Sequence, residues 1–256
     1  HLKRSQFVES MRSSLRLGLW TVLVGLGGTL LSGDSLGIAM VNTQPMKMAA
    51  AEALYNTSAP ASFSIFSWGT PDGSSEIFSI RIPNLLSFLS THDWSGSVEG
   101  LNDLQAQYVT HYGPGNYMPI IWLTYWSFRW MIGLGLITGL VALVGLWITR
   151  KGRIELPKWV WNVAIWAAPL PVLAISLGWL FTEMGRQPWI VFGLFKTADA
   201  VSPNVSAFEV WVSLLSFVAI YSVLAVVEFK LLKRTAQEGP KTEVAEDDEN
   251  KLAVAY

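Results

Sequence analysis

Four long, predominantly apolar segments constrain the fold of this chain more than any other feature. A helix needs about 17–25 residues to cross the hydrocarbon core of a bilayer, and these segments reach or approach that length. They cover Leu17–Gly33, about Ile120–Thr149, Trp159–Thr182 and Val210–Val227. Hydrophobic residues make up 51% of the chain, charged residues 14%, and the mean hydropathy is +0.37. The sequence therefore predicts an all-α integral membrane protein with four transmembrane helices.

The charges between these segments predict their orientation. Basic residues gather before the first segment, between the second and third, and after the fourth, at Lys3, Arg4, Arg12, Arg16, Arg150, Lys151, Arg153, Lys158, Lys230, Lys233 and Arg234. The connection between the first and second segments is instead mainly acidic. By the positive-inside rule this large loop is extracytoplasmic and the C-terminus is cytoplasmic.

The same pattern divides the chain into four parts. The predicted parts are a cytoplasmic basic segment with a transmembrane helix at 1–33, an extracytoplasmic loop at 34–119, three transmembrane helices at 120–234 and a disordered cytoplasmic tail at 235–256.

A carboxylate, Glu183, stands at the end of the third apolar segment. An ionised group at that depth is costly unless a cation, a metal or water compensates it, and the negative end of the helix dipole adds to the cost. Helical spacing places Trp179, Arg186 and Gln187 on the same face, and Pro188 then stops the helix. One interpretation is an interfacial ion pair with Arg186 beside aromatic-belt tryptophans, and the other is a ligand site.

Four short motifs follow one another along the chain. They are Gly33-Asp34-Ser35-Leu36-Gly37, Gln44-Pro45-Met46-Lys47-Met48-Ala49-Ala50-Ala51-Glu52, Tyr125-Trp126-Ser127-Phe128-Arg129-Trp130-Met131 and Gly185-Arg186-Gln187-Pro188-Trp189. Together they resemble signature segments of subunit I of the cytochrome bd-type quinol oxidases. The resemblance extends from about Arg16 to Arg234 and corresponds to the C-terminal part of that subunit.

The resemblance implies a haem-containing terminal oxidase of the bacterial cytoplasmic membrane. Such an enzyme oxidises menaquinol or ubiquinol at the extracytoplasmic side and reduces molecular oxygen to water. The implied cofactors are haem b558, haem b595 and haem d. The implied partners are a second oxidase subunit, membrane lipid and, in some complexes, small single-helix subunits, with no nucleic acid.

In the family, the long loop binds quinol. Lys47 and Glu52 match the basic and acidic residues implicated there in quinol oxidation, and Met46–Tyr55 is typical of a short amphipathic helix. Five positions apart, the two charged side chains point to different sides of a helix, so they are not expected to form a salt bridge. In an unrelated loop, the ordinary interpretation of such residues would be two solvated surface charges.

Met131 matches the family's axial ligand to the low-spin haem b558. A methionine in an apolar helix is otherwise a gap-filling core residue. Gly135, Thr138 and Ala142 continue its face and would leave room for a macrocycle or for close helix packing. Arg129 is expected to pair with haem propionates, although it does not share a face with Met131.

Glu183 resembles the axial carboxylate ligand of a high-spin haem, b595 or d. Trp179 resembles the aromatic residue that lies between haems, and Arg186 would offset the charge of propionates. All the matched sites would lie near the extracytoplasmic boundary, so electrons from quinol would travel sideways.

The residues that usually hold haem are scarce. The chain has no Cys, which excludes thiolate-ligated haem, iron–sulfur clusters and c-type haem attachment. His1, His92 and His111 all lie outside the apolar segments. The histidine ligands are therefore expected from a missing upstream part of the subunit.

Two other classes of membrane protein fit some of these features. A transporter places charged residues at broken helices, but no repeated pair of Gly/Pro-interrupted segments is evident. A non-catalytic membrane subunit would explain four helices and an interfacial Glu–Arg pair, but not a large aromatic loop. An optical spectrum distinguishes these classes from a haem oxidase.

Overall fold

The computed structural model describes residues 2–70, 75–150 and 158–238. It divides into two compact units, His1–Ala200 and Val201–Tyr256. Four helices of the described part are long and apolar enough to cross a membrane, which confirms the predicted number of spans. The spans are Arg12–Thr43, Ile121–Ile148, Asn162–Gly185 and Ala207–Glu238.

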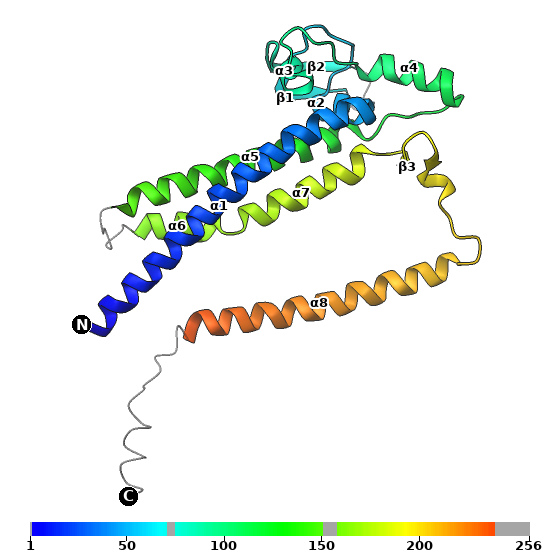
Figure 1. The fold of residues 1–256 in the computed structure, drawn as a ribbon. Coiled ribbons are helices and arrows are strands. Elements are labelled where there is room, and N and C mark those ends of the chain that lie inside the picture. The colour runs from blue at the N-terminus through cyan, green and yellow to red at the C-terminus, as the bar shows by residue number, and fades with distance from the viewer. Residues whose placement is uncertain (1, 71–74, 151–157, 239–256) are drawn as a thin grey trace, which may run out of the picture. The chain divides into compact units, whose positions relative to one another are not determined.

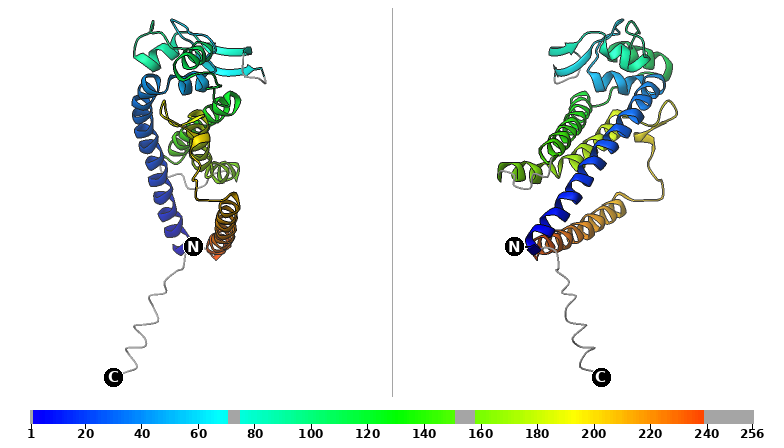
Figure 2. Two further views of the ribbon diagram at one scale, coloured as in Figure 1. Left: turned by 90° about the vertical axis from the view of Figure 1, so that its right-hand side faces the viewer. Right: turned by 60° about the vertical axis from the view of Figure 1, so that its left-hand side comes forward.

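The first unit is built on three long helices, α1 (Leu2–Thr43), α5 (Ile121–Ile148) and α7 (Leu170–Gly185). Helix α5 packs along α7 and also against α1 (Figures 1 and 2). Glycines allow the second contact, because Cβ atoms at Gly139 and Gly145 would lie 3.1 and 2.9 Å from the side chains of Leu26 and Leu19. The start of α5 differs from the predicted Ile120 by one residue.

Helix α1 continues ten residues beyond the predicted boundary at Gly33, since it ends at Thr43. Asp34 and Ser35 interrupt the apolar run after Gly33, but polar residues do not stop a helix. The first effective stop is Pro45, which lacks a backbone N–H. The last ten residues of α1 therefore carry the chain into the predicted loop region.

The third predicted span is divided into two helices. Helix α6 (Lys158–Ala167) ends just before Pro169, and α7 begins at Leu170. A proline ring clashes with the preceding turn, which accounts for the break. The basic residues Lys151 and Arg153 lie outside the described residues.

Basic residues of α1 contact the C-terminal end of α5. Arg12 Nη2 donates to Thr149 O at 2.7 Å, and Arg16 Nη1 donates to Thr149 Oγ1 at 3.1 Å. The basic residues before the first span thus contact the end of the second, beside Arg150. This arrangement agrees with placing both clusters on one side of a membrane.

The loop between α1 and α5 is folded. It contains α2 (Pro45–Glu52), the antiparallel strands β1 (Phe63–Gly69) and β2 (Glu76–Ile82), α3 (Leu85–Thr91) and α4 (Leu101–Tyr112). Gly69, the last residue of β1, pairs with Glu76, the first residue of β2.

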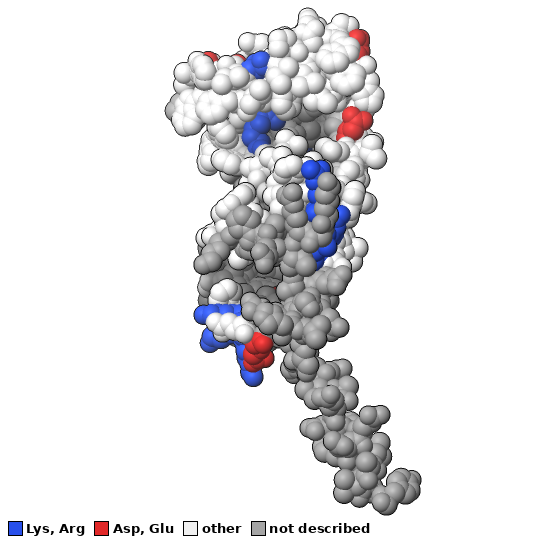
Figure 3. Space-filling model, turned by 90° about the vertical axis from the view of Figure 1, so that its left-hand side faces the viewer, with Lys and Arg blue, Asp and Glu red and all other residues white. Residues whose placement is uncertain are grey.

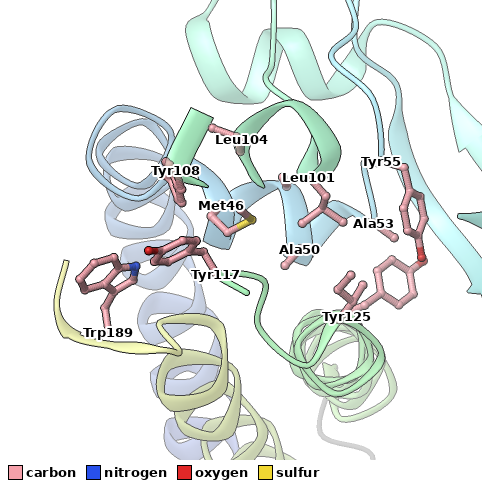
Figure 4. Packing of buried hydrophobic residues seen from close by; sticks show 12 residues of the cluster. Met46, Ala50, Ala53, Tyr55, Leu101, Leu104, Tyr108, Tyr117, Tyr125 and Trp189 are labelled. Atoms are coloured by element: carbon pink, nitrogen blue, oxygen red, sulfur yellow. The ribbon is translucent and has the colours of Figure 1, made fainter. Parts of the chain in front are cut away.

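Aromatic residues join this loop to the segment after α7. That segment forms a small antiparallel pair, β3 (Trp189–Val191) and β4 (Phe195–Lys196), followed by the 3₁₀ helix η2 (Thr197–Asp199). Trp189 stacks on Tyr117 with the ring centroids 5.7 Å apart. Figure 4 shows both rings beside Met46 of α2 and Tyr108 of α4, and all four residues belong to one buried cluster.

Helix α2 is buried on nearly all sides, whereas the sequence of Met46–Tyr55 predicts a short amphipathic helix. Its buried residues are Met46, Met48, Ala49, Ala50, Ala51 and Glu52. The alanines are small enough for α4 and α5 to approach the α2 backbone closely. Because Glu52 is buried, its charged form would destabilise the fold unless another group pairs with it.

The second unit contains α8 (Ala207–Glu238). A capping box starts it, because Ser206 Oγ accepts from Glu209 N while a Glu209 oxygen accepts from Ser206 N at 2.7 Å. Helix α8 extends beyond the predicted Val210–Val227, and the rest of the predicted tail lies outside the described residues. On the face drawn in Figure 3, much of the described surface is free of charged side chains.

Candidate functional site

A buried ion pair joins the loop to α5. Glu52 ends α2, and its Oε2 accepts a hydrogen bond from Arg129 Nη2 at 2.5 Å and another from Ser64 N at 3.1 Å. The side chains of Glu52 and Arg129 are only 2% and 8% exposed. The pair therefore lies away from water, where an unpaired charge would be strongly disfavoured.

The environment of this pair affects the two groups differently. Burial raises the pKa of the Glu52 carboxyl, and the nearby Arg129 charge and hydrogen bond oppose that rise. The Arg129 guanidinium lies between aromatic faces, 4.5 Å from the Phe63 ring centroid and 4.9 Å from that of Tyr125. Arg129 Nε and Nη1 are buried without a hydrogen-bond partner among the described residues. The arginine thus retains donors for a further acceptor.

Lys47 points away from Glu52, toward the end of α7. Its Nζ donates to Thr182 O at 3.4 Å and lies 5.0 Å from the Phe181 ring centroid. Burial lowers the Lys47 pKa, Glu183 raises it, and Arg186 lowers it. As predicted, Lys47 and Glu52 do not pair with each other; they face opposite parts of the helical core.

Glu183 lies at the end of α7, with the positively charged side chains of Arg186 and Lys47 nearby. Arg186 Nη2 donates to Glu183 Oε2 at 2.5 Å, and Gln187 Nε2 donates to Glu183 O at 3.2 Å. The predicted shared face is thereby confirmed for these three residues. Arg186 and Lys47 both stand at the negative end of the helix dipole, where cations are favoured, so they offset the carboxylate.

Met131 is placed against α7. A Cβ at Gly178 would lie 2.7 Å from Met131 Sδ, so glycine is what allows the sulfur to approach α7. Trp179 follows directly and is 67% exposed. As the spacing predicts, Met131 and Arg129 leave α5 in different directions, one toward α7 and the other toward the loop.

The small-residue face of α5 is only partly open. Thr138 and Ala142 are buried within the described part, whereas a Cβ at Gly135 would meet nothing within 4 Å. Of the two predicted uses of this face, close packing therefore applies at Thr138 and Ala142. Open space remains at Gly135, one turn from Met131.

Comparison with known proteins decides which family has this arrangement. A family model for cytochrome bd terminal oxidase subunit I matches residues 1–240. The chain belongs to the cytochrome bd terminal oxidase subunit I family. The family and the four apolar helices together indicate a bacterial membrane protein.

Two bacterial proteins and one solved structure illustrate the similarity. The chain is 38% identical over 239 residues to cytochrome bd ubiquinol oxidase subunit 1 of Bacillus subtilis, covering 93% of this chain and 51% of that protein. It is 29% identical over 270 residues to cytochrome bd-II ubiquinol oxidase subunit 1 of Escherichia coli, covering 83% and 52%.

The solved bd oxidase from Geobacillus thermodenitrificans matches with a TM-score of 0.74 and 30% identity, covering 90% of this chain and 50% of that one. The chain thus spans about half the length of the relatives it matches.

Membership of the bd oxidase subunit I family implies haem, and the described residues fit such a group. Arg129 and Arg186 each have buried nitrogen donors without a partner among the described residues, suited to propionate oxygens. Met131 and Glu183 are single potential axial ligands. No group of three or more His, Asp or Glu side chains that could hold a metal ion occurs in the described part.

Two residues near Glu52 were not predicted from the sequence as site residues. Ser64 and Tyr125 are both buried, and their hydroxyl oxygens lie 2.8 Å apart. Tyr125 precedes Arg129 by one helical turn, a spacing that indicates a shared face. For Ser64 the sequence contains no comparable signal, because its role depends on how β1 packs.

Proposed function

We propose that this chain is part of a haem-containing terminal quinol oxidase that oxidises quinol at the extracytoplasmic side and reduces oxygen to water. The observation that carries the proposal is the buried Glu52–Arg129 pair. In this pair, a loop carboxylate that is suited to proton transfer contacts α5, the helix that also carries Met131. Membership of the bd oxidase subunit I family supports the same function.

Quinol oxidation releases protons with its electrons, so its site needs a proton acceptor and polar partners for the ring oxygens. We assign the acceptor role to Glu52, whose pKa is raised by burial while the nearby Arg129 charge and hydrogen bond oppose the rise. Lys47 is assigned to the same reaction as the basic residue. Its Nζ lies beside the end of α7, near enough to Glu183 for that carboxylate to raise its pKa.

Haem would supply electron transfer and oxygen reduction when bound. Met131 would hold the haem b558 iron, and Glu183 the iron of haem b595 or haem d. Arg129 and Arg186 would bind propionates through their unpaired donors. Trp179, exposed beside Gly178, would lie between haems and serve inter-haem electron transfer.

The surroundings follow from the same proposal. The folded loop would lie on the extracytoplasmic side and the C-terminus in the cytoplasm. The substrates would be menaquinol or ubiquinol and molecular oxygen. A second oxidase subunit, lipid and, in some complexes, small single-helix subunits would cover the many exposed apolar side chains of the long helices.

The test uses the complete purified complex that contains this chain. We expect haem b and chlorin bands in its optical spectrum and quinol-driven oxygen consumption. Glu52→Gln should depress turnover while every haem band remains, because the loop carries substrate chemistry. Glu99→Gln is the matched control, since Glu99 is an exposed loop carboxylate that accepts from Gln107.

Each contrary outcome is informative. A featureless visible spectrum would support a transporter or a non-catalytic subunit instead. Normal turnover in Glu52→Gln would remove Glu52 from the reaction, and loss of haem in that variant would make the loop a structural element.

A further inference from the structure

A pair of buried hydroxyl groups lies directly behind the Glu52 carboxylate. Ser64 Oγ, on β1, and Tyr125 Oη, on α5, are 2.8 Å apart. Ser64 is 0% exposed and Tyr125 2% exposed. Figure 4 shows Tyr125 extending from α5 toward the Ala53 end of α2. A hydrogen bond in such a dry place fixes the positions of both its partners.

The two hydrogen bonds to Glu52 Oε2 both depend on this pair. One comes from Ser64 N, so the position of Ser64 sets where that N–H points. The other comes from Arg129, whose guanidinium carbon lies 4.9 Å from the Tyr125 ring centroid. Tyr125 thus reaches one donor through its hydroxyl and the other through its ring.

The strand alone does not hold Ser64 in place. The register of β1 against β2 shifts between Ser64 and Phe66, where the regular ladder is interrupted. An interrupted ladder fixes its residues less tightly than a regular one. The Tyr125 hydroxyl supplies a tether to α5 at that point.

We propose that Tyr125 is a positioning residue for Glu52 in quinol oxidation, acting on the carboxylate through Ser64. This inference rests on the proposed function of Glu52. It concerns the hydroxyl specifically, because the ring contact with Arg129 and the packing of α5 would survive in a phenylalanine.

The charges around Glu52 define what a pH measurement would report. Arg129 faces it from α5, and Arg81 acts on it from β2 while paired with Glu76 at 3.3 Å. Lys47, on the same helix as Glu52, is directed to the end of α7. The Ser64 hydrogen bond favours the charged carboxylate. Loosening it should therefore move the acid limb of the activity profile to higher pH.

The experiment compares Tyr125→Phe, Ser64→Ala and the double variant in the complete oxidase. Each single variant should lower kcat by about two- to tenfold, the range expected for one hydrogen bond. Each should also shift the acid limb upward. Because both variants remove the same contact, the double variant should resemble the singles. Tyr108→Phe, which removes another buried hydroxyl of the same cluster, should change neither kcat nor the acid limb.

The outcomes separate this inference from the proposed function. If Tyr125→Phe has the wild-type kcat and pH profile while Glu52→Gln still depresses turnover, the inference is overturned and the proposed function stands. Additive losses in the double variant, or loss of haem bands in both single variants, would also overturn it, since they indicate separate or purely structural roles. A normal Glu52→Gln enzyme would instead contradict the proposed function.

Discussion

Glu52 and Arg129 are 77 residues apart in the chain, yet their charged groups meet at 2.5 Å in a buried position. One belongs to the loop and the other to the membrane helix that presents Met131. The pair is therefore a direct polar link between the part of the chain assigned to quinol and the part assigned to haem.

Arg129→Met should destabilise the protein by leaving Glu52 buried without its cation. Breaking a buried ion pair from one side typically costs about 3–5 kcal/mol, whereas replacing both partners by apolar residues is often close to neutral. We expect Arg129→Met to lower the thermal denaturation temperature of the assembled complex, and Glu52→Leu with Arg129→Met to recover most of the loss. Equal stability of the single and double variants would contradict this.

The same variant should make stability depend on pH. Burial raises the pKa of Glu52, and Arg129 opposes the rise. Removing Arg129 should therefore raise the Glu52 pKa further. A carboxyl whose folded-state pKa exceeds its unfolded value contributes stability at low pH and loses it as pH rises through the folded pKa. Arg129→Met should thus be more destabilised at high pH than at low pH. A pH series of denaturation temperatures checks this, with Arg129→Met/Glu52→Gln as a control that should lack the added dependence.

Met131→Leu tests the assigned low-spin ligand. Leucine nearly conserves volume and apolarity, so packing against Gly178 should change little, while the thioether is lost. We expect selective loss of the low-spin haem signal or a lower reduction potential, measured by a redox titration of the optical spectrum. An unchanged low-spin spectrum and potential would refute the ligand role.

Gly178→Ala tests how α7 positions that sulfur. The added Cβ would lie 2.7 Å from Met131 Sδ, so the sulfur or the helix must move. The low-spin potential should therefore shift even though residue 131 is unchanged. Gly25→Ala on α1, where a Cβ would meet nothing within 4 Å, is the control and should behave as wild type. If both variants have the wild-type potential, the close approach has no role in tuning that haem.

Apolar runs predicted the membrane helices well because a bilayer imposes length and composition on a helix. The second span starts and ends within one residue of its predicted bounds, Ile120 and Thr149. The first helix was predicted too short, because the polar residues that interrupt an apolar run do not interrupt the backbone hydrogen bonds of a helix. The break at Pro169 has a sequence signal, but hydropathy alone passes over it.

The candidate site was only partly predictable. Spacing along one helix correctly grouped Glu183 with Arg186 and Gln187, and separated Lys47 from Glu52. The contact of Glu52 with Arg129 depends on how the loop folds back on α5, which no local pattern encodes. The assignments of Met131, Glu183, Trp179 and the two arginines to haem stay predictions.

The most direct test of the account is the haem content of the complex that carries Glu183→Ala. Glu183 lies at the negative end of the α7 helix dipole, which disfavours a carboxylate, and a ferric haem would compensate its charge more fully than Arg186 and Lys47 do. We expect loss or disorder of one high-spin haem, retention of the low-spin haem band and no oxygen reduction. Glu183→Asp, one methylene shorter, should keep some of the cofactor with weaker binding. A full haem complement with normal activity in Glu183→Ala would show that the carboxylate is only an ion-pair partner of Arg186, and would contradict the assignment of the end of α7 as a haem site.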